Sequence, residues 1–166
     1  MKLLAKPIKM HSVTKDFAVG FWGDFLFTRF ISNIDSSVAN RVTAALRQLS
    51  QETKTVKLIT IISEHASVPS TDARRIMVQT LERVNIKISG TIFEGAGLRA
   101  SAVRGAIAGL YMITNSRYPQ KIFSDDNACT RWLSSTAQDI ACPVNGEELL
   151  SAIKNFRKKS EDPILG

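Results

Sequence analysis

The spacing of hydrophobic positions is clearest between residues 85 and 113, where one period gives way to another. Residues 86–93 are rich in β-branched and aromatic types, which is typical of a strand. After the corner Gly95-Ala96-Gly97, hydrophobic residues recur three and four positions apart, which predicts a helix with one buried face. That face would consist of Leu98, Ala102, Val103, Ala106, Ile107, Leu110 and Ile113. A strand joined to a helix in this way predicts half of a βαβ unit.

The opening of the chain shows the alternation of short strands. Residues 8–13, 17–21 and 25–31 predict an antiparallel meander, with a tight connection at Trp22-Gly23-Asp24. Five of the eight phenylalanines fall between Phe17 and Phe30. Because so many rings must be covered, we expect this meander to be buried on at least one face.

The middle of the chain alternates helices with strands. Residues 35–37 offer N-cap side chains for a helix, and Val56–Ile62 is nearly continuous apolar sequence, typical of a central strand covered on both faces. Ser70 or Thr71 would cap a second helix, and Ser124 a short helix after the strand Gln120–Phe123. The inward positions of the first two helices are Val38, Val42, Ala45, Leu46 and Leu49, then Ala73, Met77, Leu81 and Val84.

These elements predict one α/β domain with a mixed sheet, in which an antiparallel N-terminal meander precedes parallel β-α units and helices flank the sheet. The parallel strands would be Val56–Ile62, Ile86–Phe93 and Gln120–Phe123. We place this domain at residues 1–133. Residues 134–166 would hold a linker and a C-terminal amphipathic helix, detachable or packed on a partner. Its apolar face would be Leu149, Leu150, Ile153 and Phe156.

Composition narrows the class of protein. A chain of 166 residues with 44% hydrophobic and 22% charged residues is long enough for a real core. The formal charge of +7 is scattered, which favours a solvated surface over a nucleic-acid site. The cluster Arg157-Lys158-Lys159 suits the C-terminus of a helix better than a phosphate site.

The sequence gives little support to a metal site, a disulfide framework, a signal peptide or a transmembrane segment. Cys129 and Cys142 form neither a metal-ligand pair nor a disulfide framework, and we interpret Cys129 as a core residue rather than a reactive thiol. The first residues do not resemble a signal peptide, and no apolar run is long enough for a bilayer. These features predict a cytoplasmic protein with reduced thiols and with no metal or cofactor.

Two groups of residues could bind or transform a small molecule. Gly95-x-Gly97-x-x-Ala100 between a strand and a helix could cradle an anion, with Arg99 beside it, although helix–strand packing also explains small residues there. Glu64 and His65, with Asp72 nearby, could supply a general base. No nucleophile elbow accompanies that group, so a hydrolase ranks last.

A stripe of small residues lies on the predicted helix after the glycine corner. Ser101, Gly105 and Gly109 repeat every four residues, and each glycine costs a helix about 1 kcal/mol relative to alanine. Close approach to another backbone would offset that cost. The sheet beneath the helix and a second copy of the chain, in a homodimer, are the alternatives.

The order of elements resembles the STAS family, the domain of anti-sigma-factor antagonists and sulphate transporters, including its STAS-like relatives. The similar features are Gly23 after the second strand, the central strand VKLITII, and Ile122-Phe123-Ser124-Asp125-Asp126-Asn127-Ala128. The likeness covers approximately Lys6 to Leu133, and it implies a domain that acts by docking to proteins.

In antagonists of that family, a serine at the start of the helix after the central strand is phosphorylated and controls docking. The resemblance places Ser70, Thr71 and Asp72 there, although the family's Asp-Ser-Ser-Gly is absent. Capping of the helix is the alternative role for Ser70 or Thr71. We therefore predict a non-enzymatic regulatory or scaffolding module that binds an unidentified protein. A small-ligand or nucleotide binder using Gly95 and Gly97 is the second hypothesis.

Overall fold

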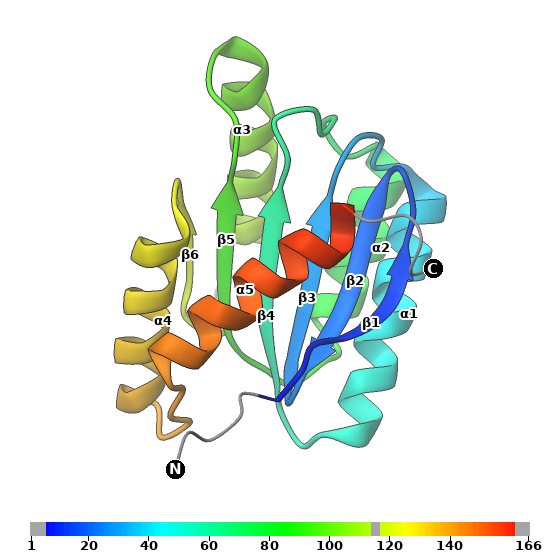
Figure 1. Ribbon diagram of the computed structural model, residues 1–166. Helices are drawn as coiled ribbons and strands as arrows, with labels where there is room; N and C mark the ends of the chain where they lie inside the picture. Colours follow the sequence, from blue (N-terminus) through cyan, green and yellow to red (C-terminus); the bar gives the residue numbers. More distant parts are fainter. Residues whose placement is uncertain (1–5, 114–116, 162–166) are drawn as a thin grey trace.

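A computed structural model describes residues 6–113 and 117–161, without the side chains of residues 99, 110, 111 and 113 (Figure 1). Six strands form one sheet whose spatial order follows the sequence. The strands are β1 (Lys9–Val13), β2 (Phe17–Trp22), β3 (Phe25–Phe30), β4 (Val56–Ile62), β5 (Ile86–Phe93) and β6 (Gln120–Phe123). The helices are α1 (Ser36–Glu52), α2 (Thr71–Leu81), α3 (Leu98–Ile113), α4 (Asp126–Asp139) and α5 (Gly146–Glu161).

The pairing of the strands confirms the predicted mixed sheet. β1, β2 and β3 form the antiparallel meander, and β3, β4, β5 and β6 run parallel. Phe30 is the register partner of Ile62, which in turn is the partner of Phe93. The carboxyl ends of β3, β4 and β5 therefore lie level at one edge of the sheet.

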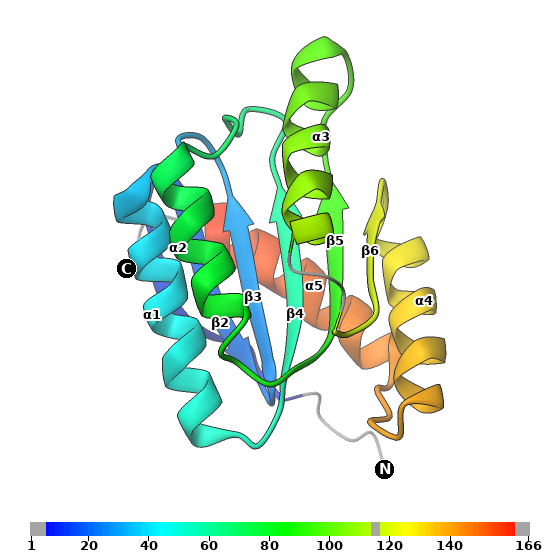
Figure 2. The ribbon, with the colours of Figure 1, turned by 180° about the vertical axis from the view of Figure 1, so that it is seen from behind.

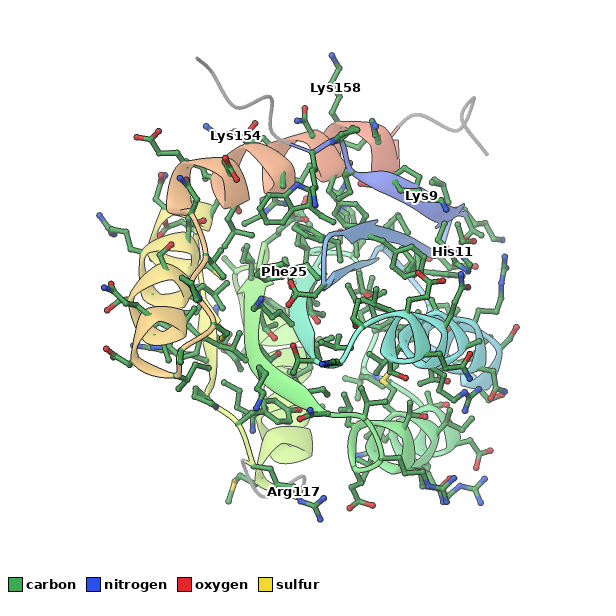
Figure 3. All side chains as sticks on the ribbon, turned by 90° about the horizontal axis from the view of Figure 1, so that it is seen from below. Lys9, His11, Phe25, Arg117, Lys154 and Lys158 are labelled. Atoms are coloured by element: carbon green, nitrogen blue, oxygen red, sulfur yellow. The ribbon has the colours of Figure 1, made fainter. Side chains whose placement is uncertain are left out.

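Helices cover both faces of this sheet. α1, α2 and α3 lie on one face (Figure 2), whereas α5 crosses the other face diagonally and α4 stands beside β6 (Figure 1). The view along the strands shows the resulting three layers, with the sheet in the middle (Figure 3). Among the described residues, no helix combines the length and apolar character needed to cross a bilayer.

The meander contributes side chains to two separate core clusters, one on each face. Phe17 and Leu26 point toward α1, whereas Phe25 and Phe27 point toward α5, where the Phe27 ring lies 5.5 Å from that of Phe156. The expectation that this meander is buried is confirmed, and both of its faces are covered.

The C-terminal region differs from the prediction. α4 continues past Leu133 to Asp139, so the connection before α5 is shorter than the linker expected at 134–145. Leu149, Ile153 and Phe156 have no exposed surface and belong to the core cluster beneath α5. An amphipathic helix forms as expected, but its apolar face packs on the sheet rather than remaining free.

The cap of α4 also differs. Asp125, not Ser124, is the N-cap, and its carboxylate accepts a hydrogen bond of 2.8 Å from the Ala128 amide. Either residue could cap a helix, but a carboxylate is also stabilised by the positive end of the helix dipole. Of the three predicted cap candidates of α1 at residues 35–37, Asp35 is the N-cap, and its carboxylate accepts a 3.0 Å hydrogen bond from the Val38 amide.

The close contact of β5 with α4 depends on Gly90. A Cβ atom there would lie 2.7 Å from the Cys129 sulfur and 3.0 Å from the Leu133 side chain, so a larger residue does not fit. Cys129 is fully buried, and burial, followed by the nearby Asp126 and Asp125, raises the pKa of its thiol to about 12. The prediction that Cys129 is a core residue is confirmed.

The orientation of α3 corrects two expectations. Val103 and Ile107 are buried as predicted, but Leu98 is 93% exposed and Ala102 also faces solvent. Leu110 and Ile113 lie outside the described side chains. Cβ atoms at Gly105 and Gly109 would meet nothing within 4 Å, so the sheet beneath the helix does not explain these glycines.

Candidate functional site

The loops that follow β3, β4 and β5 meet at the carboxyl edge of the sheet, where α/β proteins commonly bind their ligands. The loop after β4 is fixed to the loop after β3 by three hydrogen bonds. The Ser67 amide donates to the Ser32 carbonyl at 2.7 Å, the Ile34 amide donates to Ser67 Oγ at 3.1 Å, and the Ser70 amide donates to the Ile34 carbonyl at 3.0 Å. These hydrogen bonds fix the two loops relative to each other at this edge of the sheet.

Gly95 brings the loop after β5 against the loop after β4. A Cβ atom on Gly95 would lie 2.9 Å from the Phe93 ring, 3.0 Å from the Ala100 Cβ and 3.3 Å from the Glu64 Cα. Packing therefore accounts for the glycine at this position. The structure thus places two predicted sites, the glycine corner and the Glu64 loop, side by side.

Gly97 has a different reason to be glycine. Its φ of +93° is rarely adopted by other residues, and a Cβ atom there would meet open space. The corner is thus accessible, as an anion site requires, but the Arg99 side chain lies outside the described residues. Anion binding by Gly95 and Gly97 stays a prediction.

Glu64 and His65 form an exposed pair. The Glu64 carboxylate lies 3.3 Å from His65 Nε2, and the two side chains are 62% and 74% exposed respectively. Water screens a pair in this position, so the geometry provides little of the enclosure that a general base needs. Asp72 is directed elsewhere, since its carboxylate accepts a 2.8 Å hydrogen bond from Arg75.

Ser70 and Thr71 are both exposed at the start of α2. Ser70 is the N-cap, and its hydroxyl accepts a 3.1 Å hydrogen bond from the Ala73 amide, which confirms the capping role. The Thr71 hydroxyl instead accepts a 3.3 Å hydrogen bond from Arg74. Because the two hydroxyls face solvent, a kinase could reach them, and phosphorylation stays a prediction.

A network of charges at the same edge, on the α5 side, was not predicted. Arg157 contacts the carboxylates of both Glu94 and Asp126, the latter at 2.5 Å. Arg29 bonds to Glu94 at 3.4 Å and to Glu161 at 3.1 Å. The network joins β3 and the end of β5 to α4 and α5, so it fixes the last turns of α5 over the sheet.

Burial governs the charges in this network. It raises the pKa of Asp126, with repulsion from Asp125 as the second cause, and it lowers the pKa of Arg157, with Arg29 as the second cause. Arg157 nevertheless keeps short contacts to its carboxylate partners, so we assign the network a structural role. No local pattern could have revealed it, since Arg29 and Glu161 are 132 residues apart.

The basic cluster at the end of α5 is divided among different partners. Arg157 points inward to the network, and Lys159 donates a 3.1 Å hydrogen bond to the Ile8 carbonyl, which ties α5 to the start of the chain. Lys158 and Lys154 point away from the helix into solvent (Figure 3). The three adjacent cations therefore do not converge on a single phosphate position.

We call the solvent-facing side of α3 the α3 outer face. The spacing of hydrophobic residues predicted that part of this face would be buried. The α3 outer face consists of the exposed residues Leu98, Ser101, Ala102, Gly105 and Met112. None of them is charged. Among the side chains that the structure describes, the large apolar ones that face solvent are Val68, Leu98 and Met112, exposed by 44%, 93% and 82% respectively.

The described residues contain no group of three His, Cys, Asp or Glu side chains that could hold a metal ion. No family model matches the chain, and neither a curated protein nor a solved structure matches it. The resemblance to STAS domains therefore stays a prediction, and the function must be argued from the geometry of the chain itself.

Proposed function

We propose that the chain is a non-enzymatic regulatory or scaffolding module that binds another protein through the α3 outer face. The observation that supports this most directly is the exposure of Leu98 and Met112, at 93% and 82%. These two side chains are separated by 14 residues of helix, or roughly 21 Å. Two large apolar side chains exposed to this extent on one side of a helix, with no charged residue between them on that side, suit a surface that a partner covers.

The charges around the strip indicate the chemistry of the partner. α3 contains no acidic residue, and Arg104 is exposed on it, with its guanidinium 5.1 Å from the centre of the Phe93 ring. Arg117 follows the helix and is exposed at its end (Figure 3). We infer a protein partner with an apolar strip bordered by Asp or Glu, because opposite charges at the rim of an interface favour encounter and register.

The exposed hydroxyls at the start of α2 give this interaction a means of control. Ser70 and Thr71 lie at the carboxyl edge of the sheet, as does the N-terminus of α3. A phosphate there would add about −1.5 to −2 charges and would be stabilised by the helix dipole. Because the proposed partner is acidic, phosphorylation should weaken binding without unfolding the domain.

Site-specific photo-crosslinking in native lysate tests the location of the surface. A benzophenone residue at Ser101, on the α3 outer face, should crosslink an acidic protein, whereas the same residue at Lys154, on the outside of α5, should not. Crosslinking to a second copy of the chain would replace the proposal with a homodimer. Equal crosslinking from both positions would contradict it.

Binding measured with the purified partner tests the chemistry. The double variant Leu98→Gln/Met112→Gln should weaken binding at least tenfold, since it removes the apolar anchors without adding charge. The control Lys154→Gln/Lys158→Gln changes two exposed residues of α5 and should leave binding within twofold. Added salt should weaken binding by the wild-type chain. An unaffected double variant would overturn the proposal.

A further inference from the structure

We propose that the chain also binds a small neutral molecule, about the size of one aromatic ring and bearing one hydrogen-bonding group, between the sheet and α1, α2 and α3. The proposal concerns a cavity separate from the α3 outer face and from the Gly95–Gly97 corner. It does not depend on the protein partner proposed above.

The cavity has a volume of about 110 Å³. Leu46 of α1, Met77 and Leu81 of α2 and Ile107 of α3 line its helical side, and Tyr118 also lines the cavity. An engineered apolar cavity of about 150 Å³ in another protein binds benzene. The present cavity is somewhat smaller, which limits its occupant to about one ring or a short branched chain.

The floor of the cavity carries an unusual row of hydroxyl groups. Thr28, Thr60 and Thr91 are direct register partners on β3, β4 and β5, so their side chains form a line across three parallel strands. Ser89 lies on the same face of β5, two residues before Thr91. All four residues line the cavity. Central parallel strands usually present Val, Ile or Leu to the helices that cover them, so this row calls for an explanation beyond packing.

Two of the residues in this row are almost fully buried. Thr28 and Ser89 are each only 3% exposed, and both line the cavity. A hydroxyl in such a place has lost most of its contact with bulk water. A ligand that donates to or accepts from these hydroxyls would replace that hydration, and this provides the polar half of the recognition.

The charge of the ligand follows from the rest of the lining. The described residues around the cavity include no Asp, Glu, Lys, Arg or His. A carboxylate, phosphate or ammonium group would lose its hydration there and find no opposite charge. The occupant is therefore neutral, for example a phenol or a small alcohol, and a nucleotide does not suit this cavity.

α2 and α3 both border the cavity, and they stand on either side of β4 in Figure 2. Met77 and Leu81, on the α2 side of the cavity, are half-buried rather than fully enclosed. Methionine is unbranched and has several rotatable bonds, so it adapts readily to an occupant of variable shape. The geometry thus combines an adaptable apolar rim with a fixed polar floor.

Titration with phenol and with toluene, which differ by a hydroxyl in place of a methyl group, tests the proposal. NMR spectra of the wild-type chain should show saturable shifts for Thr28, Thr60, Ser89 and Ile107 with phenol. The variant Thr28→Val/Ser89→Ala keeps the side-chain shapes nearly unchanged. It should weaken phenol binding about threefold to tenfold, as expected for the loss of one neutral hydrogen bond, and leave toluene binding within twofold or tighter.

The matched control is Thr130→Val, which alters a threonine of α4 that is 5% exposed, has no hydrogen-bond partner for its hydroxyl, and does not line this cavity. It should leave the affinity for both compounds unchanged. Absence of saturable binding at millimolar phenol in the wild-type chain would overturn the proposal, as would shifts confined to exposed residues. Equal loss of phenol and toluene binding would refute recognition by the hydroxyls.

Discussion

On the side of α4 and α5 the sheet lies against fully buried aromatic and aliphatic side chains, whereas on the side of α1, α2 and α3 the same strands line a cavity. Phe27 and Phe156 have no exposed surface, and Gly90 leaves no room for even a methyl group beside Cys129. On the opposite face, Thr60 is half-buried and borders the cavity. The two faces therefore differ in packing although they share a backbone.

The difference originates in the alternation of side chains along β4 and β5. Ile59 and Ile61 point toward α5, while Leu58 and Thr60 point toward the other helices. On β5, Ile88 and Ile92 alternate in the same way with Ser89 and Thr91. Both faces carry a buried cluster of apolar side chains, and the face toward α1, α2 and α3 also carries the row of hydroxyls that lines the cavity. We expect both faces to contribute to stability, and ligand binding to depend on the second.

Removal of α5 should produce the largest effect. Truncation after Ala137 would expose Phe25, Phe27 and Ile59, which the helix covers, so the remaining chain should lose its cooperative unfolding transition in circular dichroism. The sequence alone predicts the opposite result, because it treats this helix as detachable. A truncated chain that unfolds cooperatively near the wild-type midpoint would show that the α5 face is dispensable.

Two isoleucines on opposite faces provide a matched comparison. Ile153→Ala on α5 should cost the upper part of the roughly 2–5 kcal/mol typical of such changes, because the site is fully enclosed. Ile107→Ala on α3 should fall near the lower end of that range, since Ile107 already borders a cavity. Urea denaturation measures both free energies of unfolding. Equal costs would mean that the two faces are equally well packed.

Substitution of two glycines, one closely packed and one in open space, tests how closely each region of the molecule is packed. Gly90→Ala should destabilise the chain by about 1–3 kcal/mol, as expected for overpacking against Cys129 and Leu133. Gly105→Ala, in open space on α3, should stabilise it by about 0.5–1 kcal/mol, because alanine favours a helix. Thermal unfolding of the two variants gives the signs. If Gly105→Ala is destabilising, then α3 packs more closely than the structure shows.

An effect of similar size concerns the N-cap of α2, one of the helices on the face that carries the cavity. Ser70→Ala should cost about 1 kcal/mol through the loss of its hydrogen bond from Ala73. Ser70→Asp keeps a capping oxygen and should leave stability nearly unchanged. The neighbouring control Thr71→Ala removes an exposed hydroxyl that does not cap the helix. A cost for Thr71→Ala equal to that for Ser70→Ala, by denaturant unfolding, would contradict this assignment.

Much of the fold could be predicted from local patterns. The alternation in the meander and the run VKLITII identify strands whose partners follow from chain order, and Asp35 and Ser70 are recognisable as caps because capping involves residues only three positions apart. The orientation of α3 could not be predicted in the same way. It carries small or apolar residues on nearly every side, so a buried stripe containing Leu98 fits the spacing as well as the observed one.

The site was harder to predict than the fold because its features depend on distant residues. Glu64 and the Gly95 corner were each recognised locally, but their contact requires the parallel register of β4 and β5. The network of Arg29, Glu94, Asp126 and Arg157 joins β3, the end of β5, α4 and α5. The cavity lies between the sheet and three helices, so residues from many separate segments of the sequence together determine its volume.

The identity of spatial and sequential strand order has a consequence for biosynthesis. Each strand pairs with the one made just before it, so the sheet can assemble in the order of translation. The covering helix α5 comes last, and about 130 residues separate Phe25 from Phe156. At roughly 5–20 residues per second, the surface around Phe25 stays uncovered for about 7–26 seconds. During that interval the nascent chain presents a hydrophobic face that a ribosome-associated chaperone would recognise.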